Sequence, residues 1–198
     1  FLYKLKQDQL ANIMLPLGEY TKEEIRRIAK ENGLDVSDKP DSQDFYEGDY
    51  NELLGVEEKI GNIVDTNGKV LGQHTGIWNY TIGQRKGIGI SAAEPLYVIE
   101  LRKDTNEVVV GFKDKTFKKS LKAINMNWIA VDNLTEETRA TAKIRSTQQP
   151  VDVTVKPIDD KSVEVIFDDY QKSIAIGQSV VLYNDDVVIG GGIIDSVQ

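Results

Sequence analysis

The sequence predicts a mainly β protein, in which a small helical piece at the N-terminal end precedes two small β modules. Two observations support this prediction. Apolar residues recur at helical spacing in the first part of the chain, whereas after residue 60 apolar and polar residues alternate with a period of two. The alternating stretches are short and separated by turn residues, which is typical of small barrels and sandwiches.

The helical piece contains one well-marked helix, in the stretch YTKEEIRRIAKENGLDV. Thr21 is a natural N-cap, and Glu24 stands three residues later, which completes a capping box. An apolar stripe follows at helical spacing, and Gly33 is a C-terminal stop. We also expect a helix from Gln7 to Met14 and one helical turn from Tyr50 to Leu54.

The β part begins with two predicted hairpins. The first turns at Asn67-Gly68, the strongest short hairpin signal, and the second turns at residues 104–106. Residues 131–139 are the best candidate for a break within this β region. Further strands are predicted over residues 122–130, 140–144, 151–156, 162–167, 179–183 and 187–195.

The composition excludes several kinds of site. The chain of 198 residues has no cysteine and one histidine, which excludes disulfides, thiolate nucleophiles and histidine-rich metal sites. Its apolar runs are too short to span a bilayer, so we expect no membrane contact and a cytoplasmic location. A net charge of -8 argues weakly against a nucleic-acid partner. Seven Lys and Arg residues within residues 102–122 form either a phosphate-binding patch or a solvated strand edge. We favour the solvated strand edge.

The stretch HTGIWNYTIGQRKGIGI holds the lone histidine, His74, and a glycine-rich loop around Gln84, Arg85 and Lys86. The loop matches neither the P-loop pattern nor the dinucleotide-binding pattern. Arg85 could hold a phosphate with two hydrogen bonds, or the loop could be a tight connection with a solvated tip. A lone histidine at a strand end is usually a structural hydrogen-bonding residue.

Four stretches together resemble one family, the tRNA-specific 2-thiouridylases: LGQHTGIWNYTIGQRKGIGI, EPLYVIELRKDTNEVVVG, AKIRSTQQPVDVTV and IAIGQSVVLYNDDVVIGGGII. The first 45 residues are similar to the end of that family's ATP-pyrophosphatase domain. The resemblance implies three parts: residues 1–45 as the C-terminal remnant of an α/β ATP-pyrophosphatase (PP-loop) domain, residues 46–118 as a central β domain, and residues 119–198 as a C-terminal β-barrel.

The resemblance also implies chemistry. Family members bind ATP, with Mg, through a Ser-Gly-Gly-x-Asp-Ser loop, adenylate the wobble uridine of tRNA and replace its O2 by sulfur from a cysteine persulfide. The implied partners are the tRNA anticodon arm and a sulfur-carrier protein or other sulfur donor. This sequence contains neither that loop nor a cysteine. We therefore expect a fragment of a longer enzyme, with the ATP loop upstream of Phe1, that is inactive by itself and binds no cofactor.

The position of the family's persulfide cysteine falls near Phe45 or Tyr46. Neither side chain can carry a persulfide. Two explanations stay open: a variant sulfur route, such as an iron–sulfur cluster held by upstream cysteines, or loss of the activity.

Residue by residue, the resemblance implies tRNA contacts at Arg145, Ser146 and Gln178, where a planar guanidinium suits phosphates or base edges. Gln84, Arg85 and Lys86 are expected to face the RNA or the mouth of the active site. Asp41, Ser42 and His74 are expected beside the catalytic pocket, and no metal ligands are expected. The alternative function is a non-catalytic β module that binds RNA or docks a sulfur carrier.

Overall fold

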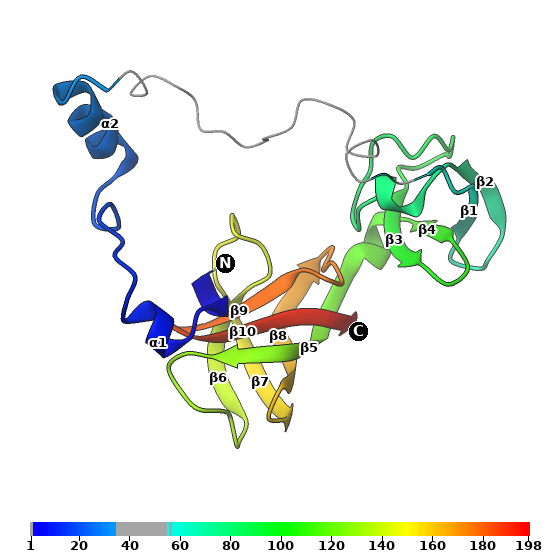
Figure 1. Ribbon diagram of the computed structural model, residues 1–198. Coiled ribbons are helices and arrows are strands. Elements are labelled where there is room, and N and C mark those ends of the chain that lie inside the picture. Colours follow the sequence, from blue (N-terminus) through cyan, green and yellow to red (C-terminus); the bar gives the residue numbers. More distant parts are fainter. Residues whose placement is uncertain (1, 35–54, 56) are drawn as a thin grey trace. The chain divides into compact units, whose positions relative to one another are not determined.

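The computed structural model describes residues 2–34, 55 and 57–198 (Figure 1). The chain divides into two compact units, one of residues Asp8–Glu57 and one of residues Phe1–Gln7 with Glu58–Gln198. The second unit contains a four-stranded sheet and a closed six-stranded barrel. The predicted fold class, mainly β with a barrel, is confirmed.

The helix α2 (Lys22–Glu31) has the predicted caps. Thr21 Oγ1 accepts a hydrogen bond from the backbone N–H of Glu24, and the carboxylate of Glu24 accepts one from the N–H of Thr21 at 2.7 Å. The hydroxyl of Thr21 also donates to this carboxylate, and the two hydrogen bonds lower the pKa of Glu24. At the other end Gly33 adopts a φ of 68°, and the N–H of Leu34 reaches back to the carbonyl of Ala29. The ends of α2 are therefore set by local chemistry.

The predicted helix from Gln7 to Met14 is only one turn long, α1 (Gln7–Leu10). Asn12 Nδ2 donates to the carbonyl of Asp8 at 2.8 Å, and such side-chain bonds to the backbone compete with helix continuation. The helical turn expected from Tyr50 to Leu54 lies outside the described residues. Three short 3-10 helices complete the helical elements of the described residues: η1 (Leu2–Lys4), η2 (Ile77–Asn79) and η3 (Lys113–Thr116).

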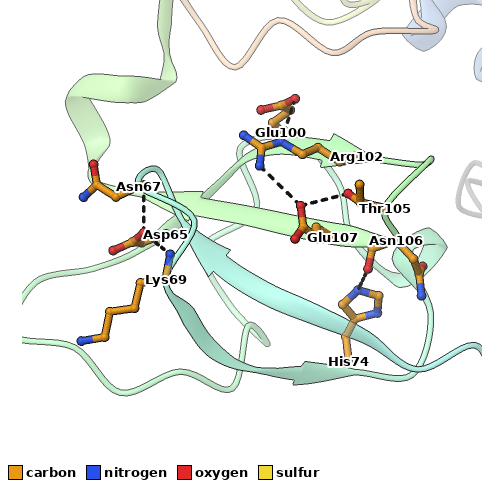
Figure 2. Close-up of polar contacts among 9 residues, drawn as sticks. All are labelled: Asp65, Asn67, Lys69, His74, Glu100, Arg102, Thr105, Asn106 and Glu107. Atoms are coloured by element: carbon orange, nitrogen blue, oxygen red, sulfur yellow. Dashed lines mark hydrogen bonds and ion pairs between the residues drawn. The ribbon is translucent and has the colours of Figure 1, made fainter.

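The four-stranded sheet is built from the two predicted hairpins. Its strands are β1 (Gly61–Asp65), β2 (Val70–His74), β3 (Tyr97–Arg102) and β4 (Glu107–Gly111), in the order β2-β1-β4-β3. The hairpin pairs are antiparallel, and β1 and β4 pair in parallel. Figure 2 shows the first turn, where Asp65 Oδ1 accepts hydrogen bonds from the backbone of Asn67 and Lys69. Gly68 supplies the positive φ, 85°, that this turn requires.

The barrel contains all of the further strands that the alternating pattern predicts. They are β5 (Phe117–Trp128), β6 (Thr138–Lys143), β7 (Val151–Asp159), β8 (Ser162–Lys172), β9 (Ser179–Asn184) and β10 (Val187–Val197). They close in the order β10-β5-β8-β7-β6-β9, and every pair is antiparallel. Closure leaves no unpaired strand edge. The break expected at residues 131–139 coincides with the interruption between β5 and β6, but it does not separate two modules, because both strands belong to the barrel.

The alternating residues of the strands fill two separate cores. In the barrel the largest fully buried side chains include Phe167, Leu121 and Leu182. The sheet has its own smaller core, built around Ile63 and Val98. Each module therefore buries apolar surface of its own, which is what makes it a separate structural element.

The first residues of the chain pack on the barrel. Tyr3 is 4% exposed, its hydroxyl lies 2.8 Å from Ser179 Oγ, and its carbonyl accepts a hydrogen bond from Asn127 Nδ2. A side chain at Gly191 would collide with the Tyr3 ring, so the glycine makes room for it. The domain boundaries proposed after residues 45 and 118 stay predictions: the first lies outside the described residues, and β5 begins at Phe117.

None of the helices in the described part of the chain has the length and apolar character needed to cross a membrane. Among the same residues, no group of three or more His, Asp or Glu side chains is arranged to hold a metal ion.

Candidate nucleic-acid interface

Two turns that are far apart in the sequence meet at one end of the barrel. Arg145 and Ser146 follow the end of β6, and Gln178 immediately precedes β9. Because β6 and β9 pair antiparallel, with Lys143 opposite Val181, the residues beyond the end of β6 lie beside those before β9. The turns border a cavity of about 730 Å³, which we call the barrel-end cavity. It is lined by Tyr3, Lys4, Lys143–Thr147, Gly177–Ser179, Val181, Tyr183 and Ile193.

The barrel-end cavity is positively charged. Its lining includes Lys4, Lys143 and Arg145, and none of its lining residues is acidic. The whole chain, in contrast, has a net charge of -8. Local charge rather than total charge decides where an anionic ligand binds, so this end of the barrel is a favourable place for phosphates.

The backbone and one hydrogen bond hold Arg145 in place. Its Nη2 donates to the carbonyl of Ser173 at 2.7 Å, while the side chain as a whole remains exposed. The turn is closed by Gln148, whose Oε1 accepts from the N–H of Ile144 and whose own N–H donates to the carbonyl of Arg145. A guanidinium has five N–H donors, so most of those of Arg145 remain available for a ligand.

Strand β10 fixes the corner that carries Gln178. The N–H of Gly177 donates to the carbonyl of Ile194, and the N–H of Ile194 donates to the carbonyl of Gln178, both at 2.8 Å. Gly177 adopts a φ of 87°, a conformation that favours glycine. The exposed amide of Gln178 is thereby presented on a rigid backbone beside Arg145.

A second cavity, of about 340 Å³, lies where the loop after η2 meets the barrel. We call it the junction cavity; it is lined by Thr81–Gln84, Arg145, Lys172, Ser173, Ala175 and Gln178. Gln84 builds this loop with both ends of its amide: Oε1 accepts from the N–H of Thr81 at 3.0 Å, and Nε2 donates to the carbonyl of Lys86 at 2.9 Å. Arg145 and Gln178 line both cavities, so the two form one shared surface.

The structure does not bring Arg85 or Lys86 into either cavity. Both side chains are exposed, and Arg85 lines a different cavity of about 630 Å³ with residues 87–96 of its own loop. The three glycines of the loop, Gly83, Gly87 and Gly89, all have positive φ. Positive φ allows a tight connection, which was one of the two interpretations of this loop from its sequence.

His74 is a buried residue of the sheet, 4% exposed (Figure 2). Its Nδ1 accepts a hydrogen bond from the N–H of Gly76 at 3.1 Å, so the proton is on Nε2, which donates to the carbonyl of Asn106 at 3.2 Å. Its ring also meets Tyr80 edge to face, with centroids 5.6 Å apart. His74 therefore joins the two hairpins. The other residues expected near the catalytic pocket, Asp41, Ser42, Phe45 and Tyr46, lie outside the described residues.

The lysines that line the two cavities, Lys4, Lys143 and Lys172, and the aromatic residue Tyr3 were not predicted as site residues from the sequence. Lys143 could have been found, because it stands two residues before the predicted contact residue Arg145. Tyr3 and Lys4 gave no local signal, since their contacts with the barrel join residues more than 100 positions apart.

Three family models match successive parts of the chain. A tRNA methyl transferase HUP domain matches residues 1–46, a tRNA methyl transferase PRC-barrel domain matches residues 53–112, and an aminomethyltransferase beta-barrel domain matches residues 118–194. The last of these ranges covers the whole closed barrel except its ends, and the second covers the four-stranded sheet.

Curated relatives match over nearly the whole chain. The tRNA-specific 2-thiouridylase MnmA of Endomicrobium trichonymphae is 48% identical over 196 residues, which are 98% of this chain and 54% of the relative. The proteins of the same name from Clostridium botulinum (strain Alaska E43 / Type E3) and Koribacter versatilis are 46% and 45% identical, over 99% and 97% of this chain and 56% and 55% of their own lengths. The chain thus spans about half the length of the curated relatives it matches. With these identities and three successive family models, the chain belongs to the tRNA-specific 2-thiouridylase family.

Proposed function

We propose that this chain is the tRNA-docking portion of a tRNA 2-thiouridylase and that the barrel-end cavity binds the anticodon arm. The observation that supports this most strongly is the meeting of Arg145, Ser146 and Gln178 around one basic cavity. These residues come from two separate turns, and nothing in the barrel core requires polar side chains there. Exposed polar residues held on rigid turns are typical of a binding surface.

Each side chain has a distinct role in this proposal. The guanidinium of Arg145 donates two hydrogen bonds to a phosphate or a base edge, and Lys4 and Lys143 add positive charge around it. The amide of Gln178 both donates and accepts, which suits the edge of an unstacked base in a loop. Phosphate contacts then supply most of the affinity, and the amide contributes to selecting the base.

For the whole protein, we propose the family's reaction: ATP adenylates O2 of the wobble uridine with release of pyrophosphate, and sulfur from a donor, delivered in the cytoplasm by a partner protein, bonds to C2 as O2 leaves with AMP. No step of this chemistry is assigned to the residues described here. The 198 residues contain neither the Ser-Gly-Gly-x-Asp-Ser loop nor a cysteine, so ATP and persulfide have no fitting residues on this chain. What these residues do is bind and orient the RNA.

The test is tRNA binding by the 198-residue chain, measured by fluorescence anisotropy at several salt concentrations. We expect salt-sensitive binding that Arg145→Ala weakens by about 1–3 kcal/mol. The matched control is Arg139→Ala, which removes the same charge from the same barrel. The guanidinium of Arg139 is already paired with Asp168 through two hydrogen bonds of 2.7 Å, so its loss should leave tRNA affinity within about twofold.

Three outcomes would contradict the proposal. One is the absence of tRNA binding at low salt. Another is binding that does not respond to salt and is equally strong in Arg145→Ala, which would favour a module that docks a sulfur-carrier protein. The third is an equal loss in the two arginine variants, which would mean that binding follows net charge and that the barrel-end cavity is not the site.

A further inference from the structure

We propose that the junction cavity holds one phosphodiester of the RNA backbone between Lys172 and Arg145, so that bound RNA bridges the four-stranded sheet and the barrel. This inference rests on the proposed function, and it adds a contact site and a cationic residue that the resemblance did not provide. It follows from where the two cations are held, from the chemistry of the cavity wall and from the continuity of the two cavities.

Lys172 is held at the junction by an aromatic ring. It is the last residue of β8, and its Nζ lies 5.2 Å from the centroid of the Tyr97 ring on β3. Tyr97 is 9% exposed, so the ring is a fixed platform of the sheet. Within the described residues no carboxylate forms an ion pair with Lys172, so its charge is not neutralised there.

The adjacent residue holds the second cation. The carbonyl of Ser173 accepts the hydrogen bond from Arg145 Nη2, and the N–H of Ser173 donates to the carbonyl of Thr116 at 2.7 Å. Ser173 adopts a φ of 55°, the left-handed conformation that non-glycine residues rarely adopt. This backbone turn places the side chain of Lys172 and the guanidinium of Arg145 on the same cavity.

The wall of the junction cavity suits an anion with several oxygens. Its lining has two cations and no acidic residue, in a chain with 32 acidic residues. The volume of about 340 Å³ is at the small end of the range for ligand sites.

A phosphodiester of RNA fits better than a free phosphate because the junction cavity is continuous with the barrel-end cavity. Arg145 and Gln178 line both cavities. A polynucleotide can place a base or phosphate in the larger cavity and the neighbouring phosphate in the smaller one. Arginine binds a phosphate with two parallel hydrogen bonds, and lysine adds a point charge from another side.

The first test compares Lys172→Met with Lys119→Met. Lys119 is a close match, because its Nζ also lies over a ring, 5.3 Å from the centroid of Tyr170, and it does not line the junction cavity. Both variants lose one charge and keep an apolar stem. For Lys172→Met we expect about fivefold to tenfold weaker tRNA binding and a plot of log affinity against log salt that is shallower by about 0.7–0.9. Lys119→Met should match the wild type in tRNA affinity and in the slope of this plot. Equal urea midpoints for the two variants and the wild type would exclude misfolding.

The second test identifies the phosphate. An anticodon stem-loop is made with one neutral methylphosphonate at a time, and each is titrated against the wild type and Lys172→Met. One position should weaken wild-type binding about tenfold and weaken binding by Lys172→Met clearly less, because in that variant the contact with Lys172 is already lost and only the contact with Arg145 remains. If no position behaves in this way, or if Lys172→Met and Arg145→Ala are additive in a double variant, the two cations do not share a phosphate and the inference is wrong.

The outcomes separate this inference from the proposed function. If the wild type binds tRNA and Arg145→Ala weakens binding but Lys172→Met behaves as Lys119→Met, only the junction site fails. If the wild type does not bind tRNA, the proposed function fails first. Inorganic phosphate, titrated at constant ionic strength, is the third probe. If phosphate alone binds tightly and this binding depends on Lys172, while RNA binding does not depend on Lys172, then the junction cavity binds a free anion and not a phosphate of the RNA.

Discussion

The polar residues of the four-stranded sheet and those at the end of the barrel differ in what their side chains bond to. In the sheet, His74 uses both ring nitrogens on the backbone, and Gln84 uses both ends of its amide on its own loop. At the barrel end, Arg145 uses one nitrogen on Ser173 and remains exposed, as does Gln178. The residues most conspicuous in the sequence therefore build structure, and the less conspicuous ones are free to bind a ligand.

The arginines show the same contrast. Arg102 on β3 contacts Glu100 and Glu107, and its hydrogen bond with Glu100 is the main cause that raises the pKa of Arg102. Arg139 is paired with Asp168. Arg145 has no acidic neighbour in either cavity. Part of the basic span from residue 102 to 122 is thus neutralised locally.

The largest expected effect concerns the contact between the two modules. Gly83 has a φ of 85°, and a Cβ there would lie 2.3 Å from Ser173 Oγ. Gly83→Ala should destabilise the protein by about 2–4 kcal/mol, because it combines a left-handed alanine with overpacking. Gly89→Ala is the matched control: its φ is 76° and nothing lies within 4 Å, so we expect about 1–2 kcal/mol. Urea unfolding measures both.

A second variant sharpens this result. Ser173→Gly removes the colliding side chain and suits the left-handed backbone at that position. Adding it to Gly83→Ala should restore most of the stability lost beyond the level of Gly89→Ala. If it restores nothing, or if the two glycine variants lose the same stability, then the loop and the barrel are not in firm contact at this point.

An effect of comparable size is expected for His74→Ala. The substitution leaves the carbonyl of Asn106 and the N–H of Gly76 without their buried partner, which costs about 1–3 kcal/mol for each group left unsatisfied. Fluorescence of Trp78, next to the site, should report a lower urea midpoint for the sheet. Binding of tRNA at a urea-free condition should stay within about twofold of the wild type. Unchanged stability together with lost tRNA binding would place His74 in the interface instead of the framework.

The smallest expected effect is a pH dependence in the barrel. The hydrogen bonds from Arg139 lower the pKa of Asp168 below its ordinary value of about 3.9. A carboxylate with a lowered pKa in the folded state adds stability above its ordinary pKa and loses it as the pH falls through the folded value. The stability difference between the wild type and Asp168→Asn should therefore be constant from about pH 5 to pH 8 and vanish in acid.

Both partners of this pair are exposed, so the difference should be small and should decrease further in high salt. A difference that grows as the pH falls would have the wrong sign, and the bond would then have no role in stability. Thermal unfolding at a series of pH values, with Asp168→Asn beside the wild type, is the measurement.

Local sequence chemistry was enough to predict most of the elements. The capping box at Thr21, the hairpin at Asn67-Gly68 and every barrel strand follow from residues a few positions apart, and the structure has all of them. The helix expected from Gln7 was too long, because a single side-chain bond from Asn12 favours its end. Closure of the strands into one barrel could not be read from the pattern, which fits a sandwich equally well.

The site was less predictable because it depends on contacts between distant residues. Arg145, Ser146 and Gln178 came from the resemblance, and their meeting follows from the pairing of β6 with β9, which alternation alone does not specify. Lys172 became relevant only when the ring of Tyr97, 75 positions away, was found beneath it. Arg85 and Lys86 were expected to face the RNA, yet neither lines the two cavities beside Arg145, and Arg85 lines a separate one.

The most direct measurement locates the RNA on the protein. Amide resonances of the 15N-labelled chain are followed while an anticodon stem-loop is added at low salt. We expect the largest shifts at residues 143–148 and 172–179, around Arg145 and Gln178, with residues 85–90 and the surroundings of His74 unchanged. Shifts confined to residues 85–90, with the end of the barrel unaffected, would contradict the account and would return the binding role to the glycine-rich loop.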